Sequence, residues 1–129
     1  MSEVVLKEYK VKEIRFYNTF GNAQQITFSN KFGYNVKYTN GDVCIGELNV
    51  EMFDKDNPEN FGFKLIIDGV FKYNTELKKE QVHILSFKEL FPFAKSIVAT
   101  VSVNAGVPPI LLPSLDMEKQ SIYKFEKNI

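Results

Sequence analysis

The stretch from residue 42 to residue 73 most constrains what this chain can fold into. The segment "GDVCIGELNVEMFD" places an apolar side chain or a glycine at every second position, and "FGFKLIIDGVFKYN" repeats the alternation after a turn in "KDNPEN". A period of two is typical of a strand with one buried face, and Asn-Pro is a strong chain breaker. The two segments therefore predict an antiparallel hairpin, with Glu47, Asn49 and Glu51 on the polar face of its first strand.

The chain before this hairpin contains two segments of different character. "VVLKEYKVKEIRFYN", residues 4–18, favours a strand, but its alternation slips between Val11 and Ile14 and predicts a bulge near Lys12 and Glu13. Residues 19–40 are rich in Asn, Gly and Gln and have no sustained period. They predict a long loop that carries several aromatic residues.

After the hairpin the pattern becomes helical. Residues 76–85, "ELKKEQVHIL", favour a short helix, and Ser86 with Glu89 fits a capping box at the start of a second one. Pro92 predicts that this helix either bends there or begins there. Its apolar positions are Leu90, Phe93, Ala94, Ile97, Val98 and Val101, several of which would also suit a strand.

The end of the long helix and the C-terminal segment also have sequence signals. Gly106 is a candidate helix end, and Pro108 with Pro109 prevents continuation. Residues 114–129 place Leu115, Ile122 and Phe125 among charged residues, which is consistent with a terminal amphipathic helix.

Size and charge exclude several classes of protein. A chain of 129 residues predicts one domain spanning residues 1–129. Lys plus Arg and Asp plus Glu number 16 each, so no overall field favours nucleic acid or an anionic membrane. The apolar run 96–115 is broken by glycine and prolines, which excludes a membrane span. The opening "MSEVVLKEYK" lacks the apolar core of a signal peptide, so we expect a cytoplasmic location.

The chain shows no catalytic constellation. His83 is the one histidine, which excludes a multi-histidine metal site, and we expect it to be structural or solvated. Cys44, the one cysteine, follows the strand alternation and is expected to be a packed thiol. The glycines form neither a P-loop nor a dinucleotide fingerprint. We therefore expect no enzyme, no metal and no cofactor.

In the order of its elements and in three short motifs, the chain resembles the SecB family of export chaperones. "KEIRF" at residues 12–16 is similar to the end of the family's first strand. Phe28 and Phe32, followed by "NVK", resemble its crossover loop. "LFPFAKSIVATV" from residue 90 resembles its helix start, and Gly106, Pro109 and "LLPSLD" follow at the expected distance.

The resemblance implies an α+β protomer, a four-stranded antiparallel sheet with a long interface helix and a C-terminal helix, assembled as a homotetramer that is a dimer of dimers. It implies an ATP-independent holdase that binds unfolded polypeptides, including preproteins for the SecA translocase motor. The client groove it implies is lined by Phe28, Phe32, Tyr34, Val107, Ile110, Leu111, Leu112 and Leu115. The oligomer interface it implies uses Phe93, Ile97, Val98 and Val101.

Several alternatives stay open. Any one of these aromatic residues is equally consistent with ordinary core. Export members of the family are strongly acidic, and that acidity serves docking to SecA, whereas this chain is neutral. Glu47 and Glu51, on the polar face of the hairpin, are the nearest candidates for a retained acidic patch. Residues 42–60 are biased toward acidic residues, with Lys55 as the one basic residue, and this bias fits either a solvated strand face and turn or a docking surface for a basic partner. Some SecB-like proteins protect an antitoxin instead, and an oligomeric scaffold without chaperone activity is a further hypothesis.

Overall fold

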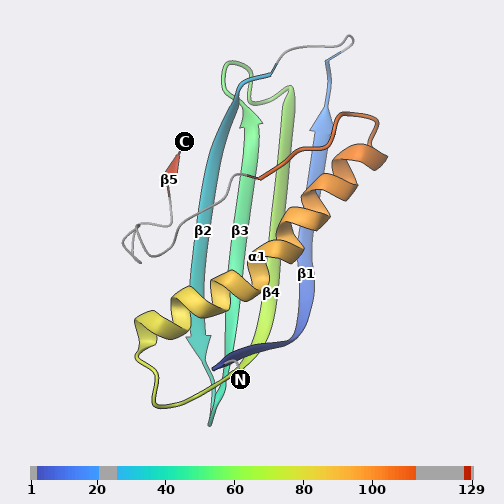
Figure 1. Ribbon diagram of the computed structural model, residues 1–129. Coiled ribbons are helices and arrows are strands. Elements are labelled where there is room, and N and C mark those ends of the chain that lie inside the picture. Colours follow the sequence, from blue (N-terminus) through green and yellow to red (C-terminus); the bar gives the residue numbers. More distant parts are fainter. Residues whose placement is uncertain (1–2, 21–25, 113–126, 129) are drawn as a thin grey trace.

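A computed structural model of the chain describes residues 3–20, 26–112 and 127–128. In chain order its elements are β1 (Val4–Asn18), β2 (Phe28–Tyr38), β3 (Val43–Asp54), β4 (Phe61–Tyr73), α1 (Lys79–Asn104) and β5 (Lys127–Asn128). The strands form one sheet in the order β1-β4-β3-β2-β5, and neighbouring strands are antiparallel. The helix crosses one face of this sheet diagonally, from β2 at its start to β1 at its end (Figure 1).

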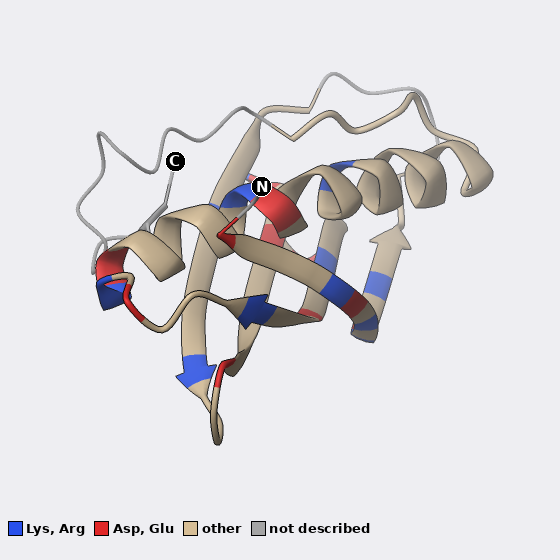
Figure 2. Ribbon diagram, turned by 60° about the horizontal axis from the view of Figure 1, so that its bottom comes forward, with Lys and Arg blue, Asp and Glu red and all other residues tan. Residues whose placement is uncertain are grey.

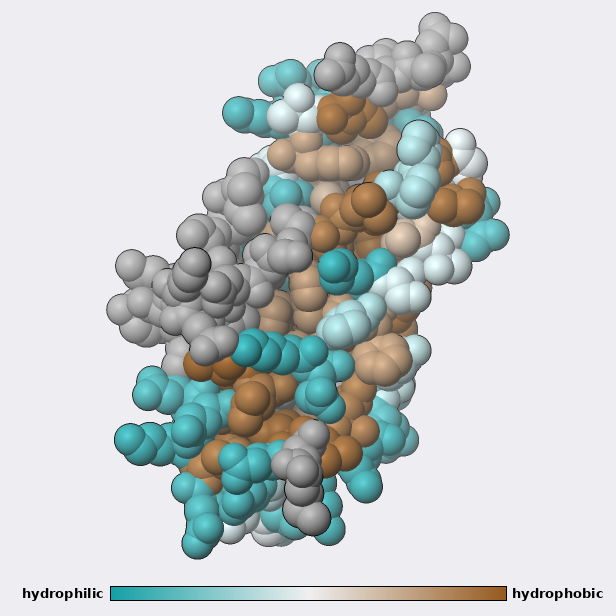
Figure 3. Space-filling view, in the orientation of Figure 1, coloured by the Kyte–Doolittle hydropathy of each residue, from teal (hydrophilic) through white to brown (hydrophobic). Residues whose placement is uncertain are grey.

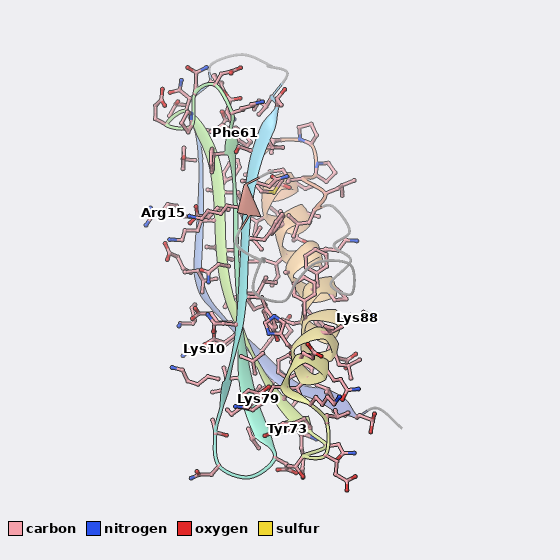
Figure 4. The ribbon with its side chains drawn as sticks, turned by 90° about the vertical axis from the view of Figure 1, so that its left-hand side faces the viewer. Lys10, Arg15, Phe61, Tyr73, Lys79 and Lys88 are labelled. Atoms are coloured by element: carbon pink, nitrogen blue, oxygen red, sulfur yellow. The ribbon has the colours of Figure 1, made fainter. Side chains whose placement is uncertain are left out.

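This arrangement confirms the predicted α+β class, with four long antiparallel strands and one long helix. The terminal helix predicted for residues 114–129 falls mostly outside the described residues, and Lys127–Asn128 pair with β2 as a strand. Viewed edge-on, the sheet carries the helix on one side, while Lys10 and Arg15 extend from the other side (Figure 4). No helix among the described residues is long and apolar enough to cross a membrane.

The predicted hairpin is confirmed by the pairing of β3 with β4. Leu48 lies opposite Ile67 and Val50 opposite Leu65, and all four side chains have 0% exposed surface. Complete burial of one such side chain stabilises the fold by roughly 1.5–3 kcal/mol. The alternation in the sequence thus supplies the centre of the core beneath α1.

The predicted irregularity in β1 is also confirmed. The register of β1 on β4 shifts between Leu6 and Glu8 and again between Val11 and Glu13. Beyond the second shift, Ile14 lies opposite Leu65, just as Val11 lies opposite Ile67 before it. Because directly opposed residues share a face, the bulge returns the apolar side chains of β1 to the face that α1 covers.

The predicted loop over residues 19–40 is wrong for its second half, which forms β2. Phe28, Phe32 and Tyr34 lie opposite Asp54, Val50 and Leu48 of β3, on the face that α1 covers. Asn30 interrupts this apolar series, and the glycine and asparagine residues of the segment reduce its strand propensity. The two-residue period of a strand is therefore hard to recognise in the sequence. Pairing with β3 overrides the local preference.

The two predicted helices are one continuous helix. Ser86 is no cap: its hydroxyl is fully buried and accepts a hydrogen bond from Tyr34 Oη at 2.6 Å. The helix starts instead where Lys78 N donates to Gln81 Oε1 at 3.0 Å. It continues through Pro92, whose side chain is exposed, and it ends before Gly106, whose φ of +89° favours glycine.

Candidate functional site

Four phenylalanines from three strands meet at one end of the helix-facing side of the sheet, where β1 ends and β2 begins. We call this set, Phe16, Phe28, Phe61 and Phe63, the aromatic corner. The ring centroid of Phe61 is 5.4 Å from that of Phe16 and 5.7 Å from that of Phe28. Figure 4 shows Phe61 at this end of the molecule. Phe61 and Phe63 are buried, whereas Phe16 and Phe28 keep part of their surface accessible.

The chain that follows α1 crosses this end of the sheet (Figure 1). We call residues 106–112 the strap. Ile110 and Leu112 are buried in the hydrophobic core that also includes Phe61 and Phe63, Val107 is half-buried, and Leu111 is 73% exposed. Within the strap, Ile110 and Leu112 therefore face the core, and Leu111 between them faces the solvent. The structure places four of the predicted groove residues here, and Leu115 lies outside the described residues.

Phe32 and Tyr34, also predicted for the groove, lie in the core of the chain. They are 4% and 6% exposed. Burial raises the pKa of the Tyr34 hydroxyl, and its ring packs on Phe87 with a centroid distance of 5.4 Å. Gly46 lies directly beneath this ring, where a Cβ atom would clash with it. Of the three predicted residues on β2, only Phe28 reaches the surface of the isolated chain.

The residues predicted for an oligomer interface separate into two groups. Val98 is fully buried against the sheet of its own chain, while Phe93 is 41% exposed and Ile97 and Val101 are half-buried. The Phe93 ring packs on Tyr9 of β1 with a centroid distance of 4.9 Å. No charged residue follows Lys95 in the helix, and its final turns carry no charge colour in Figure 2.

Glu47 and Glu51, the candidate docking carboxylates, lie on the face of the sheet away from α1. Lys12 Nζ lies 2.8 Å from Glu47 Oε2, and Lys64 Nζ lies 3.9 Å from Glu51 Oε1. The hydrogen bond from Lys12 lowers the pKa of Glu47. Figure 2 shows basic and acidic positions interspersed over the strands. Both carboxylates are thus paired within the chain.

Of the two reactive side chains noted in the sequence, Cys44 is buried and His83 is half-buried. Cys44 is buried, which raises the pKa of its thiol to about 11. Burial lowers the pKa of His83 to about 4, and its ring packs edge-on against Tyr34 with a centroid distance of 5.0 Å. Within the described ranges no three His, Cys, Asp or Glu side chains gather as metal ligands would.

Several residues important to this side of the molecule were not predicted from the sequence. Tyr9 and Ile14 are 43% and 42% exposed beside α1, because bulges in β1 turn them toward that side. Ser102 is fully buried and contacts the strap. Ser102 follows Ala94 and Val98 at a spacing of four, in the series of helix residues that face the sheet. This spacing was the signal in the sequence that could have predicted its burial. In the space-filling view, hydrophobic side chains are exposed at both ends of the helix-covered side (Figure 3).

Comparison with curated proteins places similar sequences among protein-export proteins. SecB of Paramagnetospirillum magneticum is 42% identical over 65 residues, which cover 47% of this chain and 41% of that protein. SecB of Rhizobium etli is 33% identical over 81 residues, which cover 60% of this chain and 49% of that protein. The matched part thus spans less than half the length of these relatives. No family model matches the chain.

Comparison with solved structures identifies a similar fold. The SecB-like chaperone of Mycobacterium tuberculosis, in complex with a peptide from the HigA1 antitoxin, superposes with a TM-score of 0.70 at 11% sequence identity. The match covers 88% of this chain and 91% of that one. At this identity the likeness concerns the fold.

Proposed function

We propose that this chain, a divergent SecB-like protein, is an ATP-independent holdase that binds unfolded or non-native polypeptides. The observation that carries the proposal is an apolar site with accessible members, the half-buried Phe28 and the exposed Leu111. A surface that serves many sequences gains affinity from apolar area, at about 25 cal/mol per Å². Such binding requires neither a cofactor nor a catalytic group.

The residues of the proposed groove have two different roles in this proposal. Phe28, Val107 and Leu111 contact the client directly, because their side chains reach the surface of the free chain. Phe32, Tyr34, Ile110 and Leu112 support them from within. Leu115 stays a predicted member of the wall. Backbone groups of an extended client can in addition pair at a strand edge.

The experiment that tests the holdase function is suppression of aggregation of a chemically unfolded protein without ATP. We expect suppression at stoichiometric amounts. Phe28→Ser combined with Leu111→Ser should weaken it, since both side chains are accessible, and the oligomer should stay intact. Val5→Ser is the matched control, because Val5 is 39% exposed and lies opposite Lys72 on the face away from α1. A lack of suppression even at large molar excess would contradict the holdase proposal.

A second candidate is a chaperone dedicated to an antitoxin. It is favoured by the fold shared with the Mycobacterium tuberculosis protein, which was solved with an antitoxin peptide. Polypeptides that co-purify with the protein from the cytoplasm of its own cell distinguish the candidates. A dedicated chaperone would retain one small partner, a general holdase would retain many, and a scaffold would assemble normally and retain no unfolded chain.

The proposal includes assembly as a homotetramer through the C-terminal half of α1. Phe93, Ile97 and Val101 offer partly exposed apolar surface there, and Tyr9 extends it onto β1. Phe93→Ser should lower the molar mass measured by light scattering, whereas Lys88→Ser, on the outward side of the same helix (Figure 4), should leave it unchanged. An unchanged mass in both variants would contradict this interface.

Docking of SecA through Glu47 and Glu51 is the remaining part of the proposal. Lys12 and Lys64 already pair with these carboxylates, so we expect weak docking that is suppressed by salt. Glu47→Lys with Glu51→Lys should reduce it further in a binding assay at low salt. SecA affinity that survives the double substitution would place the docking surface elsewhere.

A further inference from the structure

The strap is held to the helix at two points by a single residue, Ser102. Val107 N donates a hydrogen bond to the Ser102 backbone oxygen at 3.2 Å. Ile110 N donates a second one to Ser102 Oγ at 2.8 Å. Ser102 is 0% exposed, so water does not compete for these contacts. Of these two hydrogen bonds, the one that holds Ile110 in place depends on the Ser102 side chain.

The hydroxyl of Ser102 is oriented by the helix itself. Its Oγ lies 2.9 Å from the carbonyl oxygens of both Val98 and Ala99. The single hydroxyl proton is donated back to the helix, which leaves the lone pairs of Oγ available to accept from Ile110 N. Alanine at this position would leave the Ile110 N–H buried without its acceptor. The free-energy cost of this unsatisfied donor would destabilise the closed position of the strap relative to the open one.

The strap covers apolar surface that the helix leaves open. Because α1 crosses the sheet diagonally, the end of the sheet with the aromatic corner lies beyond it, and the strap passes there (Figure 1). Ile110 and Leu112 are buried and belong to the same continuous hydrophobic core as Phe61 and Phe63. Pro108 and Pro109 have no N–H, so the strap has few backbone donors with which to hold its closed position. The strap is thus easier to remove from the sheet than α1 is.

We propose that Ser102 is a positioning residue that latches the strap over the aromatic corner in the free protein, and that an apolar client segment releases the strap and takes its place. This inference rests on the proposed function. The strap itself defines the chemistry of the occupant, an extended segment with large apolar side chains two residues apart, as Ile110 and Leu112 are. A latched site binds such segments more weakly than an open one, because part of the binding free energy is used for opening.

The test uses Ser102→Ala and the matched control Ser86→Ala. Both serines are fully buried in α1, but the Ser86 hydroxyl bonds to Tyr34 and to the His83 carbonyl and not to the strap. Hydrogen exchange of the Ile110 amide should be about tenfold faster in Ser102→Ala than in the unaltered protein, and unchanged in Ser86→Ala. Ser102→Cys keeps the side-chain size with a weaker acceptor, so it should give an intermediate rate even if the alanine variant folds poorly.

The client half of the inference is tested with a fluorescently labelled synthetic peptide of residues 106–112 and with an unfolded protein. Ser102→Ala should bind the peptide roughly three- to tenfold more tightly than Ser86→Ala does. Ile110 exchange that is equal in the two variants would overturn the latch. Faster exchange without binding of peptide or unfolded protein by any variant would overturn client release together with the proposed function, and would leave the latch intact.

Discussion

The sheet beneath the first half of α1 and the aromatic corner beneath the strap contain similar side chains but have different covers. The first is covered by a helix whose backbone is internally hydrogen-bonded and whose Val82, Phe87 and Leu90 are buried. The second is covered by a strap held at Ser102. Under the proposed function, hydrophobic composition alone therefore does not decide which surface is available to a client. We expect the way in which the covering segment is held to decide it.

The largest effect should come from removing a side chain on the sheet-facing side of α1. Leu90 is 0% exposed, and Leu90→Ala should lower the free energy of unfolding by about 2–5 kcal/mol because the rigid surroundings retain a cavity. Ile110→Ala in the strap should be at or below the lower end of this range, since the strap can shift into the space. Urea denaturation of both variants measures the difference, and equal losses would contradict the distinction between the two covers.

A pH effect should come next, through His83 of α1, whose ring packs on Tyr34. Burial lowers its pKa from the ordinary 6.5 to about 4, so between these values the unfolded chain binds more protons than the native one. Stability from this group is therefore full above pH 6.5 and declines as the pH falls toward 4. Because the ring is half-buried and solvent screens part of the cost, we expect roughly 1–2 kcal/mol. His83→Gln should flatten this part of the stability profile, and an unchanged slope would contradict it.

A smaller effect should follow from the hydrogen bond that fixes β2 to the helix. Tyr34→Phe removes the bond from Tyr34 Oη to Ser86 Oγ and should cost about 1 kcal/mol in chemical denaturation. A double-mutant cycle with Ser86→Ala isolates the pair. Exchange of the Ile110 amide should not respond, since this bond belongs to the helix-covered half. A response there would show that the two halves are coupled.

The smallest effect should be on the outer face of the sheet. Glu51 and Lys64 lie 3.9 Å apart and are partly exposed, so Glu51→Gln should change stability by less than about 0.5 kcal/mol at moderate salt. This variant provides the baseline against which the helix-facing substitutions are measured. A loss as large as that of Tyr34→Phe would mean that the ion pairs stabilise the sheet more than exposed pairs do.

The sequence predicts the fold where a pattern is strong and local. The alternation in β3 and β4 and the slip near Lys12 and Glu13 were enough to predict the hairpin and the bulge. The β2 strand was missed because Asn30 and neighbouring glycine hide a pattern that pairing with β3 enforces. The continuous helix was missed because Pro92 suggests a boundary, although its exposed position tolerates the ring.

The candidate site was predictable to a similar extent. Leu111 and Phe28 are accessible at the predicted wall. The burial of Phe32 and Tyr34 could not be deduced while their segment was assigned to a loop, because only strand parity places them toward the core. The role of Ser102 depends on contacts between the helix and the strap, which no local pattern reveals.

The two register shifts in β1 have a consequence for the protein among its clients. β1 is the outermost strand at one edge of the sheet, and a long regular edge is a template on which other extended chains stack into aggregates. Bulges twist such an edge and interrupt its ladder, and Lys7, Lys10 and Lys12 add charge along it. A protein proposed to collect unfolded chains thus carries protection against becoming the seed of their precipitation.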